Sequence, residues 1–256
     1  MKRIVVKVGS AVLTQDGNIA LERMQSLVDF LAELKKNNEV ILVSSGAVSA
    51  GYTKVQLDRE SIQNKQALAA IGQPILMKKY AKKFASYNIT TAQVLVTAAN
   101  LSHQDEIQRV KNTVDILIEN DVVPIVNEND ATATDELVVG DNDQLSAYIT
   151  KHTKADILII LSDIDAYYDS DPRQNPHAKV LKIVNDISEE ELNKEVTPNN
   201  VFATGGIVTK LKAASYLMRS GIEMFLASGF DLSDAKTFMI DGVHKGGTHF
   251  KIKNPL

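Results

Sequence analysis

The chain of 256 residues is long enough to bury a substantial core, and its lack of cysteine excludes thiolate nucleophiles and cysteine zinc sites. A formal net charge of −4 leaves no basic surplus for wrapping a polyanion, so we expect no nucleic acid partner. Lys7 interrupts the first apolar stretch and no apolar run reaches the length of a membrane span, so the sequence predicts a cytoplasmic protein with no membrane partner.

Apolar runs alternate along the chain with segments of helical period. In chain order they predict a strand over residues 3–8, a helix over 21–34, a strand over 39–43, a helix over 61–84, a strand over 90–96, a helix over 104–119, a strand over 122–126, a helix after residue 143, strands over 156–161 and 180–184, a helix over 207–219 and a last strand over 222–226. We expect the second helix to break or kink at Pro74, because proline loses a donor and clashes one turn back. The alternation predicts an α/β fold, a three-layer αβα sandwich with a mainly parallel central sheet.

Polar or glycine-bearing segments follow the carboxyl ends of five predicted strands, at Gly9, Ser44, Asn127, Ser162 and Ser228. Parallel sheets of this kind bind ligands at that edge, although βα loops are polar in any protein of the class. The regular placement favours an enzyme or a ligand-binding protein.

The stretch over residues 124–143 concentrates carboxylates and amides at its two ends. The first cluster is Asn127-Glu-Asn-Asp130, and the second is Asp141-Asn-Asp143 before a predicted helix. The residues over 131–139 are long enough for a small hairpin or flap that brings the two clusters together. Each of these side chains also suits an ordinary turn or helix cap, but two clusters together favour a site.

Two lysines lie next to glycine-bearing turns. Lys7 lies inside an apolar strand, where it is either an edge residue reaching water or a charge held for a partner. Gly205-Gly206 lets backbone amides approach an anion at a helix start, with Lys210 one turn further on; the alternative is a plain turn before a surface lysine. With an aspartate beside Asn142, the two lysines predict phosphoryl transfer, and the five histidines are not placed for a proton relay.

Six segments together resemble the amino acid kinase family. They are Lys7-Val-Gly-Ser10, Ser44-Ser-Gly-Ala47, Asn127-Glu-Asn-Asp-Ala131, Val139-Gly-Asp-Asn-Asp143, Asp171-Pro-Arg173 and Thr204-Gly-Gly-Ile-Val-Thr-Lys210. The resemblance runs from residue 3 to about residue 250. It implies that family's fold as one domain over 1–256, with an amino acid lobe over 1–152, a nucleotide lobe over 153–256, and no RNA-binding-like domain at the carboxyl end.

The motifs are most similar to the members that use ATP to phosphorylate the side-chain carboxylate of L-glutamate, the first step of proline biosynthesis. The resemblance implies that Lys7 and Lys210 contact the phosphates and that Asp143 holds those lysines. It implies ATP and Mg²⁺ as cofactors, the metal being bridged by nucleotide phosphates with no protein ligand. The implied substrate-binding residues are Ser45, Asp130 and Asn142, and the implied nucleotide-binding residues are Lys7, Ser162, Asp163, Thr204, Gly205, Gly206, Ile207, Val208, Thr209 and Lys210.

The family further implies a homo-oligomer, feedback inhibition by proline through the glutamate pocket and the 131–139 flap, and hand-off of the product to glutamyl phosphate reductase. The residues agree with carboxylate chemistry, because a glutamate side chain with a pKa of about 4.3 is already an ionised nucleophile at neutral pH. Asp130 can receive a free ammonium, which argues against N-acetylglutamate as the acceptor. Aspartate and N-acetylglutamate remain alternative phosphoryl acceptors. A non-catalytic sensor remains an alternative function, but we would expect such a sensor to have lost Lys7, Asp143 or Lys210.

Two positions depart from the family pattern. Ser44 stands where threonine is usual and keeps the hydroxyl. Ala166 replaces a usual glycine, so the backbone near the nucleotide is expected to differ if that glycine had a positive φ.

Overall fold

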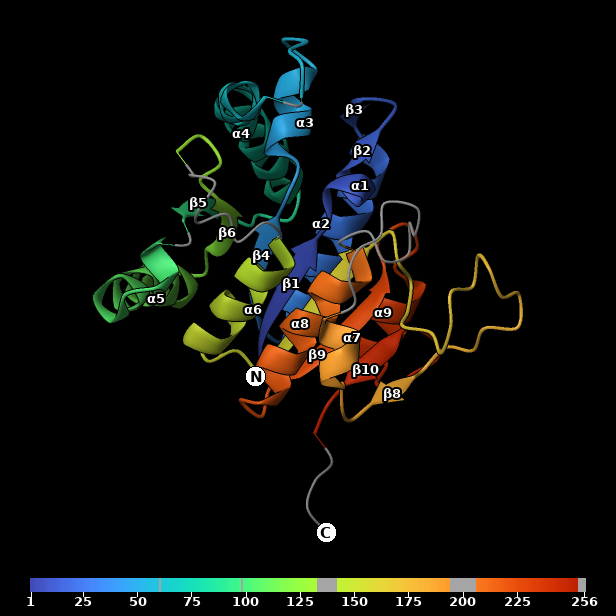
Figure 1. Cartoon of the computed structure of the whole chain (residues 1–256). Helices are drawn as coiled ribbons and strands as arrows, with labels where there is room; N and C mark the ends of the chain where they lie inside the picture. The colour runs from blue at the N-terminus through green and yellow to red at the C-terminus, as the bar shows by residue number, and fades with distance from the viewer. Residues whose placement is uncertain (60, 98, 133–141, 194–205, 253–256) are drawn as a thin grey trace.

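The computed structural model describes residues 1–59, 61–97, 99–132, 142–193 and 206–252 (Figure 1). The elements in chain order are β1 (Arg3–Val8), α1 (Ser10–Leu13), β2 (Thr14–Gln15), β3 (Asn18–Ile19), α2 (Leu21–Lys35), β4 (Glu39–Ser44), α3 (Ala47–Tyr52), α4 (Ile62–Ala85), β5 (Thr91–Val96), η1 (Ala99–Leu101), α5 (Gln104–Glu119), β6 (Val123–Glu128), α6 (Asn142–His152), β7 (Ile157–Ser162), β8 (Ile183–Val184), α7 (Glu189–Leu192), α8 (Gly206–Met218), β9 (Glu223–Ser228), α9 (Ser233–Met239) and β10 (Thr248–Phe250).

The main sheet has the strand order β5-β6-β4-β1-β7-β9-β10-β8 within the described residues. From β5 to β9 every neighbouring pair is parallel, whereas β10 pairs antiparallel with β9 and parallel with β8. The carboxyl ends of β6, β4, β1, β7 and β9 therefore meet at one edge, which is the edge that the polar segments were predicted to share.

Helices cover both faces of the sheet, which confirms the predicted αβα sandwich. Side chains of α2, α4 and α9 form one hydrophobic cluster with alternate residues of the central strands. Side chains of α5, α6 and α8 form the second cluster with the other residues of the same strands. The strand β7 is buried along all of its six residues because it packs against both clusters. Figure 1 shows α6 and α8 on the face toward the viewer, with α2 behind β1.

The structure differs from the expected elements at three places. The strand after residue 222 does not close the set, because β10 follows it and adds to its edge. The helix α4 continues through Pro74 without a break, and its buried residues Leu68 and Leu76 lie on either side of the proline. Packing of this helix therefore outweighs the loss of one backbone donor. The predicted strand over 180–184 is reduced to Ile183–Val184 plus a single bridge from Tyr168 to Val180.

The helices α3 and α4 pack closely against each other, and this contact positions Gln73 of α4 near the sheet. A Cβ atom added at Gly72 would lie 1.8 Å from the carbonyl oxygen of Ala47, so the two helices meet backbone to backbone. Gly46 precedes α3 with a φ of 104°, a conformation that glycine adopts without strain. Glycine at these two positions brings α4 close to the end of β4 and to the loop that carries Ser45.

Candidate active site

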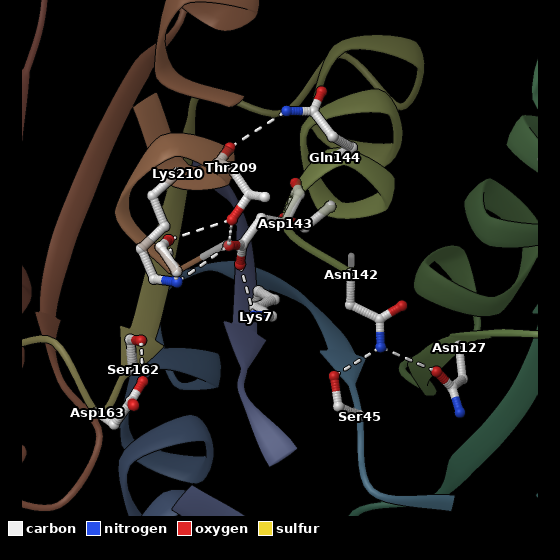
Figure 2. A network of polar contacts seen from close by, with 12 residues as sticks. Lys7, Ser45, Asn127, Asn142, Asp143, Gln144, Ser162, Asp163, Thr209 and Lys210 are labelled. Atoms are coloured by element: carbon white, nitrogen blue, oxygen red, sulfur yellow. Dashed lines mark hydrogen bonds and ion pairs between the residues drawn. The ribbon is translucent and has the colours of Figure 1, made fainter. Parts of the chain in front are cut away.

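Asp143 in the first turn of α6 joins two lysines that come from opposite ends of the chain (Figure 2). The Nζ atom of Lys7, on the central strand β1, lies 2.5 Å from Asp143 Oδ1. The Nζ atom of Lys210, on α8, lies 3.1 Å from Asp143 Oδ2. The carboxylate is fully buried and each lysine is 4% exposed, so Lys7 is a charge held for a partner and not an edge residue.

Further contacts hold the Lys210 side of this trio. Lys210 Nζ also donates to the carbonyl oxygen of Gly206 at 2.8 Å, one turn earlier in the same helix. The Thr209 hydroxyl donates to Asp143 Oδ2 at 3.0 Å, and Gln144 Nε2 donates to the Thr209 carbonyl at 3.2 Å. Lys7, Asp143 and Lys210 together carry one net positive charge in a buried position, which suits an anionic ligand.

Two of the predicted nucleotide-binding residues, Ser162 and Asp163, lie at the carboxyl end of β7, next to β1. Ser162 ends β7, and the backbone N–H of Gly9 donates to the carbonyl of the preceding Leu161 at 3.0 Å. A Cβ atom added at Gly9 would lie 3.8 Å from Lys7 Nζ, so the Lys7 amine lies directly beside this turn. The Ser162 hydroxyl donates to the exposed Asp163 carboxylate at 2.9 Å. The turn at Gly9 therefore connects the Lys7 amine to the carboxyl end of β7.

The first turn of α8 contains some of the remaining residues that were predicted to bind the nucleotide. Gly206 begins the helix, and the side chains of Ile207 and Val208 are buried in the second hydrophobic cluster. These two residues can therefore approach a ligand only with their backbone atoms. Thr204 and Gly205, like the predicted 131–139 flap from residue 133 onward, lie outside the described residues.

Two of the residues predicted to bind the substrate, Ser45 and Asn142, belong to a second polar group next to the trio. Asn142 Nδ2 donates to the Ser45 hydroxyl at 2.6 Å and to Asn127 Oδ1 at 3.1 Å. Because Asn142 and Asp143 are consecutive, the start of α6 connects the acceptor side to the lysines (Figure 2). Ser45 and Asn142 are thus brought together as predicted, while Asp130 lies in the adjoining cavity.

That cavity has a volume of about 160 Å³. Its polar lining comes from Gln73, Gln93, Glu128, Asn129 and Asp130. Burial and then the neighbouring Asp130 charge raise the pKa of Glu128 to about 7, and burial raises the pKa of Asp130. The Oε1 atom of Glu128 is buried without a hydrogen-bond partner in the described residues. Such a pocket favours a ligand that brings positive charge and N–H donors.

Gln73 and Thr209 gain roles that the sequence reasoning did not give them. Gln73 Oε1 accepts a hydrogen bond from Asn127 Nδ2 at 3.0 Å, and Thr209 orients Asp143 in addition to its place in the nucleotide loop. In the sequence, Gln73 precedes Pro74 within a predicted helix, and this pattern indicated a kink but no role in binding. Glu128 was placed in the polar cluster but not among the site residues, and its position at the end of β6 was the available signal.

The two departures from the family pattern fit the structure. Ser44 is buried, and its hydroxyl lies 2.8 Å from the hydroxyl of buried Tyr80 and donates to the Ser45 carbonyl at 3.1 Å. Ala166 is 1% exposed and is not among the residues with a positive φ. The alanine therefore introduces no left-handed strain at that position.

The contacts of Asp143 limit how this carboxylate could hold the implied Mg²⁺. Both oxygens of Asp143 already contact lysine amines, so this carboxylate is poorly placed to ligate a metal directly. No group of three histidine or carboxylate side chains suited to a metal ion occurs in the described part of the chain. Nor does that part contain a helix that is long and apolar enough to cross a membrane.

Known proteins resemble this chain over most of its length. The model of the amino acid kinase family matches residues 2–228. A glutamate 5-kinase of Wolinella succinogenes is 52% identical over 98% of this chain and 98% of its own length, and a glutamate 5-kinase of Leishmania donovani is 50% identical over 98% and 95%. Among solved structures, an isopentenyl phosphate kinase has a TM-score of 0.68 at 16% identity over 96% of this chain and 99% of its own. The UMP kinase of Ureaplasma parvum has a TM-score of 0.65 at 16% identity over 98% of each chain. The matched model and the near-complete alignments show that this chain belongs to the amino acid kinase family, among the glutamate 5-kinases.

Proposed function

We propose that the chain transfers the γ-phosphoryl group of ATP to the side-chain carboxylate of L-glutamate, giving L-glutamyl 5-phosphate and ADP. The observation that carries the proposal is the buried trio of Lys7, Asp143 and Lys210. From Asn142, the residue next to Asp143, hydrogen bonds through Asn127 lead to Gln73, which lines a cavity with acids and amides. Cations on one side and ammonium acceptors on the other match a triphosphate and a free amino acid.

The reaction places two anions in contact, so charge compensation is the main task of the site. A carboxylate oxygen of glutamate attacks the γ-phosphorus, a new P–O bond forms, and the bond to the β,γ-bridging oxygen breaks with its electrons passing to ADP. The acceptor carboxylate is ionised at neutral pH, so no protein base is required. The amines of Lys7 and Lys210 hold the phosphates, and Asp143 holds the two amines at a fixed separation.

The remaining groups orient the nucleotide and the acceptor. Ser162, Asp163 and residues 204–210 would bind the nucleotide, with Ile207 and Val208 contributing backbone groups, and the start of α8 would add the positive end of its dipole. Mg²⁺ held by the phosphates would neutralise part of the developing charge on the transferred group. Ser45, Asp130 and Asn142 hold glutamate, so residues 1–152 carry the acceptor and residues 153–256 most of the nucleotide site.

The reaction is the first step of proline biosynthesis, and we propose three further features from the family. Proline would act as a feedback inhibitor in the glutamate pocket, a homo-oligomer would be the working form in the cytoplasm, and the labile acyl phosphate would pass to glutamyl phosphate reductase. Each is tested separately, by inhibition kinetics, by sedimentation and by coupled turnover with that enzyme.

The experiment that tests the function traps the product with hydroxylamine. We expect hydroxamate to form only with the chain, Mg²⁺-ATP and L-glutamate all present. Aspartate and N-acetyl-L-glutamate, assayed in the same way, should give at most a few per cent of that rate. Absence of hydroxamate from L-glutamate, or an equal rate with either other acid, would refute the assignment.

A further inference from the structure

A line of side-chain amides runs from the edge strand β5 to the start of α6. Gln73 Nε2 donates to Gln93 Oε1 at 3.1 Å, and Gln73 Oε1 accepts from Asn127 Nδ2 at 3.0 Å. Asn127 Oδ1 then accepts from Asn142 Nδ2 at 3.1 Å. The line crosses from α4 through the buried end of β6 to the residue that we assign to substrate binding, and Gln73 and Asn127 are both almost fully buried.

The direction of this line is set by a backbone group. The N–H of Glu128 donates to Asn127 Oδ1 at 2.9 Å, and a backbone N–H can only donate. Asn127 Oδ1 is therefore the acceptor and Asn127 Nδ2 the donor, which fixes Gln73 Oε1 as the next acceptor. The orientations of all the amides follow from this one bond.

The polarity of Asn142 follows from the same bond. Its Nδ2 carries two hydrogens, and these point to Asn127 Oδ1 and to the Ser45 hydroxyl. Its Oδ1 is buried and has no hydrogen-bond partner among the described residues, and Glu128 Oε1 is in the same condition. Because buried acceptors are rarely left without a hydrogen bond, we infer that a bound ligand donates hydrogen bonds to both oxygens.

We propose that Gln73 and Asn127 are positioning residues which hold Asn142 with its oxygen toward the ligand, and that this polarity makes the acceptor pocket select a dicarboxylic acid with a free ammonium group. The inference rests on the proposed function and deepens it by naming the specificity device. An ammonium offers three N–H donors, whereas an unsubstituted dicarboxylic acid offers none there and an N-acylated one offers a single donor.

The test compares L-glutamate with glutarate, which has the same two carboxylates and no ammonium. Gln73→Met keeps the side-chain length and removes the acceptor for Asn127 Nδ2, so Asn127 loses its tether and Asn142 its fixed orientation. We expect the Kd of L-glutamate, measured by calorimetry without nucleotide, to rise roughly tenfold while the Kd of glutarate changes less than about twofold. In turnover, the KM for L-glutamate should rise with kcat within about threefold.

The matched control is Gln25→Met on α2, which removes an amide that bonds Asp29 and Lys83 outside the cavity. It should leave the ratio of the two Kd values unchanged. In a background of Asn142→Ala, Gln73→Met should have no further effect on that ratio, because Gln73 acts through Asn142.

Each outcome decides the inference. A Gln73→Met chain that keeps the wild-type Kd ratio, or a further loss in the Asn142→Ala background, would overturn it, as would a wild-type chain that binds glutarate as tightly as L-glutamate or binds neither. Absence of acyl phosphate from the wild type would refute only the proposed function, because the Kd ratios do not depend on turnover.

Discussion

Replacing Asp143 by asparagine removes the single charge that lies between two buried amines. The substitution keeps the shape of the side chain but sets an amide against Lys7 or Lys210, whose Nζ atoms lie 2.5 Å and 3.1 Å from the carboxylate oxygens. Loss of one partner of a buried charge pair costs about 3–5 kcal/mol of unfolding free energy. Because both amines lose their fixed position against the transferring phosphate, kcat should also fall about 100- to 1000-fold.

The chain contains a matched control for this change. Asp115 on α5 also lies between two cations, Arg3 at 2.7 Å and Lys111, but its side chain is 21% exposed and it lies at the amino-terminal edge of the sheet. Asp115→Asn should cost less than about 1 kcal/mol and leave kcat unchanged.

Stability is measured by urea unfolding. The kcat is measured by hydroxylamine trapping with Mg²⁺-ATP and L-glutamate both at saturating concentration. A kcat within threefold of the wild type for Asp143→Asn would refute the role given to the trio. Equal losses of kcat in the two variants would mean that general instability, and not the position of the amines, governs turnover.

Three further predictions follow from individual contacts. Lys210→Met should lower kcat at least about 100-fold with little change in the glutamate KM, measured by steady-state kinetics, since it removes charge from the phosphate and not from the acceptor. Glu128, whose pKa is raised from its ordinary 4.5 to about 7, keeps its proton in the folded state after the unfolded state has lost it. The free energy of unfolding of the wild type, measured by urea titration, should therefore fall relative to that of Glu128→Gln as the pH rises from about 4.5 to about 7. A difference between the two free energies that stays constant over this range would contradict the raised pKa. Gly72→Ala places a Cβ 1.8 Å from the Ala47 carbonyl oxygen and should cost about 3 kcal/mol or more in thermal unfolding, whereas Gly17→Ala, with nothing within 4 Å and a φ of 75°, should cost about 1 kcal/mol.

The sequence predicted the central elements because their patterns are long and regular. The buried strand β7 and the periodic helix α2 have no competing interpretation, and their bounds agree with the structure to within a residue or two. The strand β10 has three residues after two glycines, which is too short for a period to show. Its position depends on pairing with β9, a contact that local sequence does not encode.

The candidate site divides in the same way. The approach of Lys7, Asp143 and Lys210 was expected from the family resemblance of their motifs, since the local sequence alone left an ordinary structural role open for both lysines. The role of Gln73 was not expected, since its partner Asn127 is 54 residues away and the bond exists only after α3 and α4 have packed. Motifs identify the residues that touch a ligand, whereas the groups that orient them follow from tertiary contacts.

A crystal structure with L-glutamate, Mg²⁺ and a non-hydrolysable ATP analogue tests the central claim most directly. We expect the γ-phosphate between the amines of Lys7 and Lys210, the side-chain carboxylate of glutamate facing it, and the ammonium within hydrogen-bond distance of Asn142 Oδ1. A nucleotide whose phosphates lie away from both amines, or a glutamate outside the pocket that contains Asp130, would contradict the account.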